Sequence, residues 1–183
     1  MPGELLSREE IFNGDRISLR RDRLRFGSKQ TSREIVVHPG AAAAVPIADG
    51  GDILLIEQYR HSVGATLFEI PAGTLEEGET AEECIRRELV EEVGFRADSL
   101  EPLLTIAPSP GIMTERISIY LARGTEVGGQ SLDLGEELSV ARISMDQALE
   151  LVSAGPLVDA KSFIGLVAAA RHMAKEDAQE EAR

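Results

Sequence analysis

The sequence contains one cysteine, Cys84, and no tryptophan. A single cysteine cannot form a disulfide framework within the chain. No apolar run approaches the length of about 20 residues that a helix needs to cross a bilayer. The first ten residues, MPGELLSREE, lack the apolar centre of a signal peptide. These absences lead us to expect a cytoplasmic protein without a membrane segment.

Basic residues are scarce relative to acidic ones. There are 19 lysines and arginines against 32 aspartates and glutamates, and the formal net charge is −13. Proteins that bind nucleic acid are usually basic, and an anionic membrane surface also attracts basic segments. The charge therefore disfavours both partners and is suited to attracting a cation.

A length of 183 residues and a hydrophobic fraction of 43% are enough for one domain with a real core. Residues 1–40 are polar, and their apolar residues alternate as in half-buried strands. This segment is too thin to bury a core alone. We therefore expect an N-terminal antiparallel β subdomain over residues 1–40 and the main domain over residues 41–183.

The main domain alternates strand and helix patterns. A last helix is expected from about Lys161, with a polar tail that frays, and the helix before it is expected to be closed by Gly155. Strands that alternate with helices favour an α/β domain with helices on both faces of a sheet. The expected strands cover residues 53–59, 67–73, 103–108, 116–122 and 137–143.

Eight glutamates crowd the stretch GTLEEGETAEECIRRELVEEVGF, which begins at Gly73. Thr80 followed by Glu83 is a capping-box pattern, so a helix should begin there, and Gly94 is a natural stop. On a helical wheel Glu92 falls within the apolar stripe, and Glu88 and Glu91 fall along its edge. Glu82 and Glu83 point elsewhere, and they are expected to be solvated, as are Glu76 and Glu77 in the turn before the helix.

A carboxylate on an apolar stripe is costly unless it is paired or bound to a metal. Glu88 and Glu92 lie one turn apart, so both can reach the same point in space. Oxygen-only ligand sets suit Mg²⁺, with Mn²⁺ also possible. The alternative is a charged face neutralised by neighbouring arginines, but it leaves the burial of Glu92 unexplained.

The same stretch resembles the Nudix box: Gly, five residues, Glu, seven residues, Arg-Glu, an aliphatic residue, any residue, Glu-Glu, any residue, Gly and an apolar residue. All fixed positions are filled within 23 residues, which makes the signal specific. They are Gly73, Glu79, Arg87, Glu88, Leu89, Glu91, Glu92, Gly94 and Phe95.

The resemblance implies a Nudix hydrolase, which cleaves a nucleoside diphosphate linked to another moiety. The fold would be an α/β/α sandwich with a mixed sheet. Glu88, Glu91 and Glu92 would bind the metal, together with the backbone carbonyl of Ala72. Glu91 also counts among the candidate catalytic residues, and Arg87 would orient the carboxylates.

Beyond the box, the chain resembles the ADP-ribose pyrophosphatase and nucleotide-sugar hydrolase subgroup. The segments that carry this likeness are SREIV, IEQYR, EIPAGTLEEGE and PSPGIMTER. Each alone could be a turn or a surface charge, and their joint order is the stronger signal. The resemblance assigns substrate contacts to Arg33, Glu34, Arg60, Thr74, Ser109, Pro110 and Gly111.

In this subgroup the N-terminal strands exchange between two subunits. The resemblance therefore implies a homodimer in which residues 1–40 cross over, and it would explain why an arginine-rich segment lacks a core of its own. A nucleoside diphosphate sugar would be the substrate.

One departure from the subgroup concerns the general base. The subgroup commonly carries Glu-x-Glu in the loop before the penultimate strand, and here Leu134 stands in place of the first glutamate. Glu136 matches the second and would be the base or a metal ligand, with Glu137 and Glu115 as further candidates. All three could instead be solvated charges. If Glu136 is the base, its replacement by glutamine lowers kcat by roughly 10²–10⁴-fold.

Hydrolysis of ADP-ribose to AMP and ribose 5-phosphate is the expected reaction. Another nucleoside diphosphate sugar, such as GDP-mannose, is the alternative within the family, because a single sequence does not reveal base recognition. A Nudix-fold binding module that has lost catalysis is the alternative outside enzymes. The intact box glutamates argue against it, since a binding module has no need of a metal site.

Overall fold

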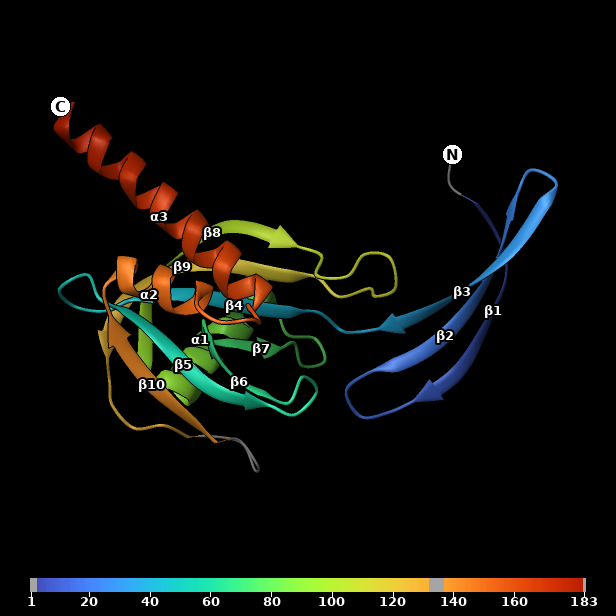
Figure 1. Cartoon of the computed structure of the whole chain (residues 1–183), viewed down its shortest axis with the longest axis horizontal. Coiled ribbons are helices and arrows are strands. Elements are labelled where there is room, and N and C mark those ends of the chain that lie inside the picture. Colours follow the sequence, from blue (N-terminus) through green and yellow to red (C-terminus); the bar gives the residue numbers. More distant parts are fainter. Residues whose placement is uncertain (1–2, 132–136, 183) are drawn as a thin grey trace. The chain divides into compact units, whose positions relative to one another are not determined.

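The structure is a computed structural model of the chain that describes residues 3–131 and 137–182. The chain forms two compact units. The first comprises residues 1–40 and 107–116, and the second comprises residues 41–106 and 117–183. Figure 1 shows the elements of both. None of the helices in the described ranges is long and apolar enough to cross a membrane.

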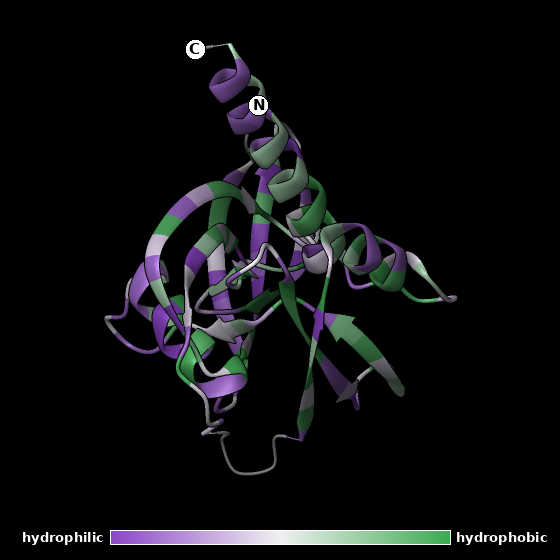
Figure 2. Cartoon of the chain, turned by 90° about the vertical axis from the view of Figure 1, so that its left-hand side faces the viewer, coloured by the Kyte–Doolittle hydropathy of each residue, from purple (hydrophilic) through white to green (hydrophobic). Residues whose placement is uncertain are grey.

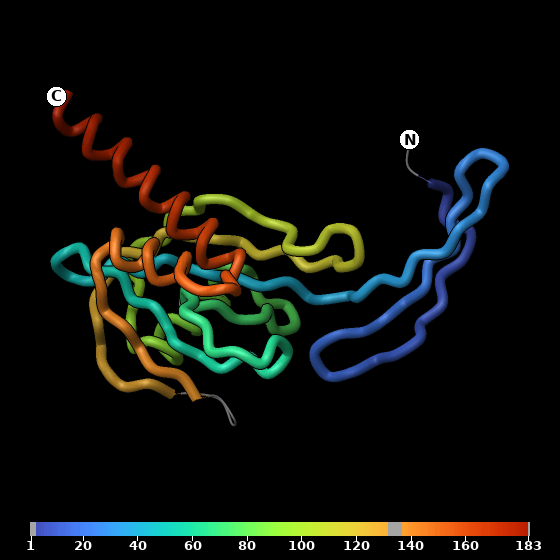
Figure 3. The backbone as a smooth tube through the Cα atoms, viewed as in Figure 1, coloured from blue at the N-terminus to red at the C-terminus, as the bar shows by residue number. Residues whose placement is uncertain are grey.

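The first unit is an antiparallel sheet with strand order β1-β2-β3. Its strands are β1 (Glu4–Asn13), β2 (Ser18–Phe26) and β3 (Lys29–Val37). Gly27, with φ of 59°, makes the tight turn between β2 and β3, and Figure 3 traces this hairpin as the lighter blue part of the tube. Residues 107–116 join the unit because Val36 donates a backbone hydrogen bond to the Ile112 carbonyl.

This three-stranded sheet has few buried side chains. Asp22, at 5% exposure, is one of them, and it accepts two hydrogen bonds from the Arg8 guanidinium. Those bonds hold the pKa of the Asp22 carboxyl below its ordinary value. Large apolar side chains remain exposed on the strands and turns of the unit, namely Leu5, Ile11, Phe12, Ile17 and Phe26.

The second unit is built on a mixed sheet with the order β10-β5-β4-β9-β8, to which β6 and β7 add at β5 and β4. The β4–β9 pair is parallel and the other pairs are antiparallel. The strands are β4 (Ala41–Ile47), β5 (Ile53–Arg60), β6 (Ala65–Glu69), β7 (Ala72–Thr74), β8 (Phe95–Ile106), β9 (Ile117–Glu126) and β10 (Leu138–Ile143).

Helices cover both faces of this sheet, and the strand residues divide between them by alternation. On β5, Leu54 and Ile56 belong to the core beneath α1 (Ala81–Val93), whereas Ile53 and Leu55 belong to the core beneath α2 (Met145–Ser153) and α3 (Ala160–Glu181). The expected α/β/α sandwich with a mixed sheet and an N-terminal antiparallel sheet is confirmed.

Several boundaries differ from the expected ones. The helix α2 ends at Ser153 with Ala154 as its cap, rather than being closed by Gly155. The polar tail does not fray in the structure: α3 continues to Glu181, and Figure 2 shows it changing from hydrophobic green near its start to hydrophilic purple toward its end. Strand β8 begins at Phe95, well before the expected residue 103, and β-bulges accommodate its polar half and Pro102.

Candidate metal and substrate site

The helix α1 begins and ends where the sequence predicts. The Thr80 hydroxyl accepts from the Glu83 backbone N–H, the Glu83 carboxylate accepts from the Thr80 backbone N–H, and Gly94 closes the helix at φ of 61°. These local signals fix the helical phase. As a result Glu92 is buried at 4% exposure, on the same side as Ile85 and Leu89.

The box glutamates lie against the strand β7. The Glu92 Oε2 atom accepts a hydrogen bond of 3.0 Å from the backbone N–H of Ala72. Gly73 follows Ala72, and a Cβ built on it would lie only 1.7 Å from the Glu88 Oε1 atom. Any side chain at residue 73 would therefore displace Glu88, so glycine is required for this close approach.

Arg87 organises the other carboxylates of the box. Its guanidinium donates two hydrogen bonds to Glu79, at 3.0 and 3.1 Å, one to Glu88 at 2.7 Å and one to Glu91 at 3.1 Å. These bonds, first of all the two with Glu79, raise the pKa of Arg87, and the bonds from Arg87 lower the pKa of the Glu79 carboxyl. Neighbouring Cys84 is buried, and burial raises its pKa to about 12, so its thiol stays protonated and structural.

The donor set around α1 fits a divalent cation. Three carboxylates, Glu88, Glu91 and Glu92, gather on or near the buried side of the helix, and they outnumber the single guanidinium of Arg87. All their donor atoms are oxygens, and Ala72, whose N–H donates to Glu92, could add its carbonyl oxygen. Such a set is the one that Mg²⁺ and Mn²⁺ prefer.

Arg60 lies at the end of β5 and is held by a carboxylate that the sequence analysis did not single out. Its Nε and Nη2 atoms donate to Glu69 at 2.7 and 2.8 Å, and Lys161 at the start of α3 also donates to Glu69. The Glu69 side chain is only 2% exposed. A glutamate within the apolar run LFEIP was a signal that could have revealed it, because a buried charge needs a partner.

The pKa of Arg60 is also affected by a carboxylate of the Nudix box. The hydrogen bonds with Glu69 raise the pKa of Arg60 most, burial opposes them, and the charges of Glu69 and Glu92 add to the rise. Arg60 therefore lies within electrostatic reach of a box carboxylate. Thr74, another expected substrate contact, is exposed at the end of β7.

The remaining expected substrate contacts belong to the first unit. Arg33 is exposed and donates to the Thr31 hydroxyl at 2.9 Å. Exposed Glu34 accepts from Arg21 at 2.9 Å, which lowers the pKa of its carboxyl. Ser109 begins a turn, since its carbonyl accepts from two following N–H groups, and that turn contains Pro110 and Gly111.

The candidates for the general base come from different parts of the chain. Glu115 lies in the first unit, 17% exposed and 3.7 Å from the His38 Nδ1 atom. Leu134 and Glu136 lie outside the described residues. Glu137 directly precedes β10 and is exposed, as a solvated charge would be.

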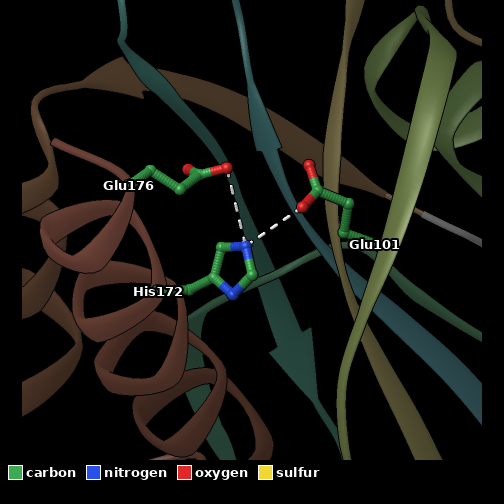
Figure 4. Close-up of side chains that lie close together, drawn as sticks. All are labelled: Glu101, His172 and Glu176. Atoms are coloured by element: carbon green, nitrogen blue, oxygen red, sulfur yellow. Dashed lines mark hydrogen bonds and ion pairs between the residues drawn. The ribbon is translucent and has the colours of Figure 1, made fainter. Parts of the chain in front are cut away.

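A second cluster of ionisable groups lies away from the box, where α3 packs on the sheet (Figure 4). His172 contacts Glu101 on β8 at 3.0 Å and Glu176 at 3.7 Å. Within the described ranges, these three residues form a group whose ligand atoms could reach one metal ion. Arg123 from β9 already pairs with both carboxylates, so we interpret the cluster as a clamp between α3 and the sheet.

Comparison with known proteins agrees with the geometry of α1. The model of the NUDIX domain matches residues 37–162. This chain belongs to the Nudix family. The matched range includes the box helix, Arg60, Glu69 and Lys161.

Two curated relatives match most of the chain. A protein named methanol dehydrogenase activator from Bacillus methanolicus is 37% identical over 161 residues, covering 86% of this chain and 87% of that protein. An ADP-ribose pyrophosphatase from Bacillus subtilis (strain 168) is 36% identical over 160 residues, covering 86% of each. The crystal structure of an ADP compounds hydrolase shares the fold, with a TM-score of 0.82, 22% identity and 96% coverage of both chains.

Proposed function

We propose that this Nudix protein hydrolyses the pyrophosphate bond of ADP-ribose to AMP and ribose 5-phosphate with the help of Mg²⁺, Mn²⁺ being an alternative metal. The observation that carries the proposal is the excess of carboxylates on α1, with the Glu92 carboxylate held against Ala72, together with a fixed cation, Arg60, whose pKa the charge of Glu92 helps to raise. The ADP-ribose pyrophosphatase from Bacillus subtilis, 36% identical, supports this substrate.

The residues of this chain divide the work. Glu88, Glu91, Glu92 and the Ala72 carbonyl would hold the metal, while Arg87 keeps the carboxylates oriented. A divalent metal there would neutralise charge on the leaving phosphate and lower the pKa of an attacking water. Arg60 would bind the anionic substrate through its guanidinium.

Further residues would complete the site. Glu136 would take the proton of the attacking water, with Glu115 or Glu91 in its place if it does not. Arg33, Glu34, Thr74 and the turn at Ser109, Pro110 and Gly111 would contact the nucleoside and the sugar.

We also propose that the protein is a cytoplasmic homodimer in which residues 1–40 cross over. The exposed Phe12 and Phe26, at 56% and 46%, support it, because a thin sheet that exposes such side chains gains from a partner. Size-exclusion chromatography should give a dimer at micromolar concentration, and a monomer there would contradict the proposal.

A substrate panel tests the proposed reaction. The purified protein is given ADP-ribose, GDP-mannose, UDP-glucose or NADH with Mg²⁺, and AMP, GMP and sugar phosphates are measured. We expect turnover of ADP-ribose to be fastest. Faster turnover of GDP-mannose would favour the nucleotide-sugar alternative. Absence of turnover with every compound would favour a binding module, a role closer to the name of the Bacillus methanolicus relative.

A further inference from the structure

Glu69 is a buried anion between two cations that come from distant parts of the sequence. Arg60 approaches it from β5 with two hydrogen bonds, and Lys161 approaches it from the first turn of α3. The exposed fraction is 2% for the Glu69 side chain and 12% for that of Lys161. A carboxylate this deeply buried is retained only with strong compensation, and here two cations provide it.

The first turn of α3 is fixed against the segment that carries Glu69. The Asp159 carboxylate caps the helix by accepting from the Ser162 N–H at 3.0 Å, and the Ser162 hydroxyl accepts from the Ile70 N–H at 2.8 Å. A Cβ on Gly165 would lie 2.8 Å from the Ile70 Cδ1 atom, so α3 packs as closely as glycine allows. The position of Lys161 relative to Glu69 is therefore set by the fold.

This arrangement orients Arg60. Its Nε and Nη2 atoms are used by Glu69, and Nη1 takes no part in those two bonds. The side chain remains 37% exposed, so the guanidinium is anchored at one edge and accessible at another. A planar guanidinium held in this way presents its remaining N–H groups to phosphate oxygens at low cost in side-chain entropy.

Lys161 maintains the charge balance of the group. Its ammonium bonds both Glu69 and Asp159, the latter at 3.0 Å. With Lys161 the four charges of Arg60, Glu69, Asp159 and Lys161 cancel. Without it, two carboxylates would face one guanidinium, and the group would repel a phosphate.

We propose that Glu69 and Lys161 are positioning residues for substrate binding: Glu69 fixes the plane of the Arg60 guanidinium, and Lys161 prevents the carboxylates from cancelling its charge. The inference rests on the proposed function in that it needs a phosphorylated substrate at Arg60. It adds two residues that lie 92 positions apart in the chain, in contact through the bond from Lys161 to Glu69.

The first test needs no substrate. The Nε–H signal of Arg60, assigned with an Arg60→Lys variant, is followed by NMR in the wild type, Glu69→Gln and Lys161→Met. We expect slow hydrogen exchange in the wild type and at least tenfold faster exchange in Glu69→Gln, because one charged bidentate partner is lost. The matched control is Glu101→Gln. It alters the clamp between α3 and the sheet and should leave the hydrogen exchange of the Arg60 Nε–H unchanged.

The second test separates binding from turnover. With ADP-ribose, Glu69→Gln and Lys161→Met should raise KM about tenfold while kcat stays within about threefold, as expected when a binding interaction is lost. Adding Glu69→Gln to Arg60→Ala should raise KM no further, because Glu69 acts through Arg60. A merely structural role would lower the active fraction and leave KM unchanged, and Glu101→Gln should leave both constants unchanged.

The outcomes distinguish this inference from the proposed function. KM values of both variants within twofold of the wild type would overturn it, as would an Arg60 Nε–H signal that Glu69→Gln does not alter. If the wild type turns over no substrate, the proposed function fails, and inorganic pyrophosphate becomes the probe. About tenfold weaker pyrophosphate binding by both variants would then support positioning, and equal binding would overturn it.

Discussion

Arg87 and Arg60 are two arginines of the second unit whose guanidinium groups are held by carboxylates, and their surroundings differ in charge. Arg87 faces Glu79, Glu88 and Glu91, so its surroundings carry an excess of negative charge. Arg60 faces Glu69, whose charge is shared with Lys161. The first arrangement suits a cation. The second has no excess of negative charge, because Lys161 offsets the carboxylates, so the Arg60 guanidinium can bind an anion. A pyrophosphate bound to a metal needs both.

The two arginines also differ in how their partners are encoded. The partners of Arg87 lie within eight residues of it in the chain. Arg60 is held by Glu69 from β6, and Glu69 is bound in turn by Lys161 from α3. Substitutions that disrupt the surroundings of one arginine at a time separate the two contributions.

The largest effect on activity is expected at the proposed metal ligands beside Arg87. Glu88→Gln keeps the shape of the side chain and removes its charge, so kcat with ADP-ribose and Mg²⁺ should fall about 10³-fold, several kcal/mol of lost transition-state stabilisation. The matched control is Glu82→Gln on the same helix, which is exposed and should stay near wild type. A fall below tenfold for Glu88→Gln would remove Glu88 from the metal ligands.

A smaller loss of activity is expected when lysine replaces Arg87, because lysine keeps the positive charge but lacks the forked guanidinium group. Arg87→Lys cannot make the two bonds to Glu79 and also reach the other glutamates, so the Mg²⁺ concentration for half-maximal rate should rise about 10–100-fold. Arg86→Lys, one residue away, is the control. Equal Mg²⁺ requirements in both variants would show that Arg87 does not orient the carboxylates.

The contribution of Glu69, the partner of Arg60, to the free energy of unfolding should depend on pH. Burial raises the pKa of Glu69, but the bonds from Arg60 and Lys161 lower it by more, so its folded pKa lies below the unfolded value of about 4.3. Its ionised form therefore stabilises the fold above that pH, and this contribution is lost as the pH falls through the folded pKa. Urea unfolding should show Glu69→Gln less stable by about 2 kcal/mol at pH 7, with a smaller difference at pH 3.

The control for that measurement is Glu77→Gln, an exposed glutamate of the box loop, which should stay within about 0.5 kcal/mol of wild type at both pH values. A difference at Glu69 that grows toward acid pH would reverse the assigned direction of its pKa.

The smallest effect is expected at the clamp of α3. Its ion pairs are partly exposed, at 35% to 40% for the side chains of Glu101, His172 and Glu176, so Glu101→Gln should cost about 0.5–1 kcal/mol in unfolding free energy. Addition of Zn²⁺ should not raise Tm, since Arg123 already neutralises the carboxylates. A rise in Tm that Glu101→Gln abolishes would make the cluster a metal site.

The comparison also explains what the sequence could predict. The caps of α1 and the burial of Glu92 follow from signals within one helix, and both are found in the structure. The contact of Glu69 with Lys161 joins segments 92 residues apart, and periodicity carries no information about such pairs. The first half of β8 was missed because Pro102 and polar residues interrupt its alternation, which the bulges accommodate.

Binding of Mn²⁺ to the substrate-free protein, measured by electron paramagnetic resonance, tests the central claim most directly. The account predicts that the wild type and Glu82→Gln bind Mn²⁺ equally, and that Glu92→Gln binds it at least tenfold more weakly. Equal Mn²⁺ binding by Glu92→Gln and the wild type would contradict the assignment of the box carboxylates as the metal site.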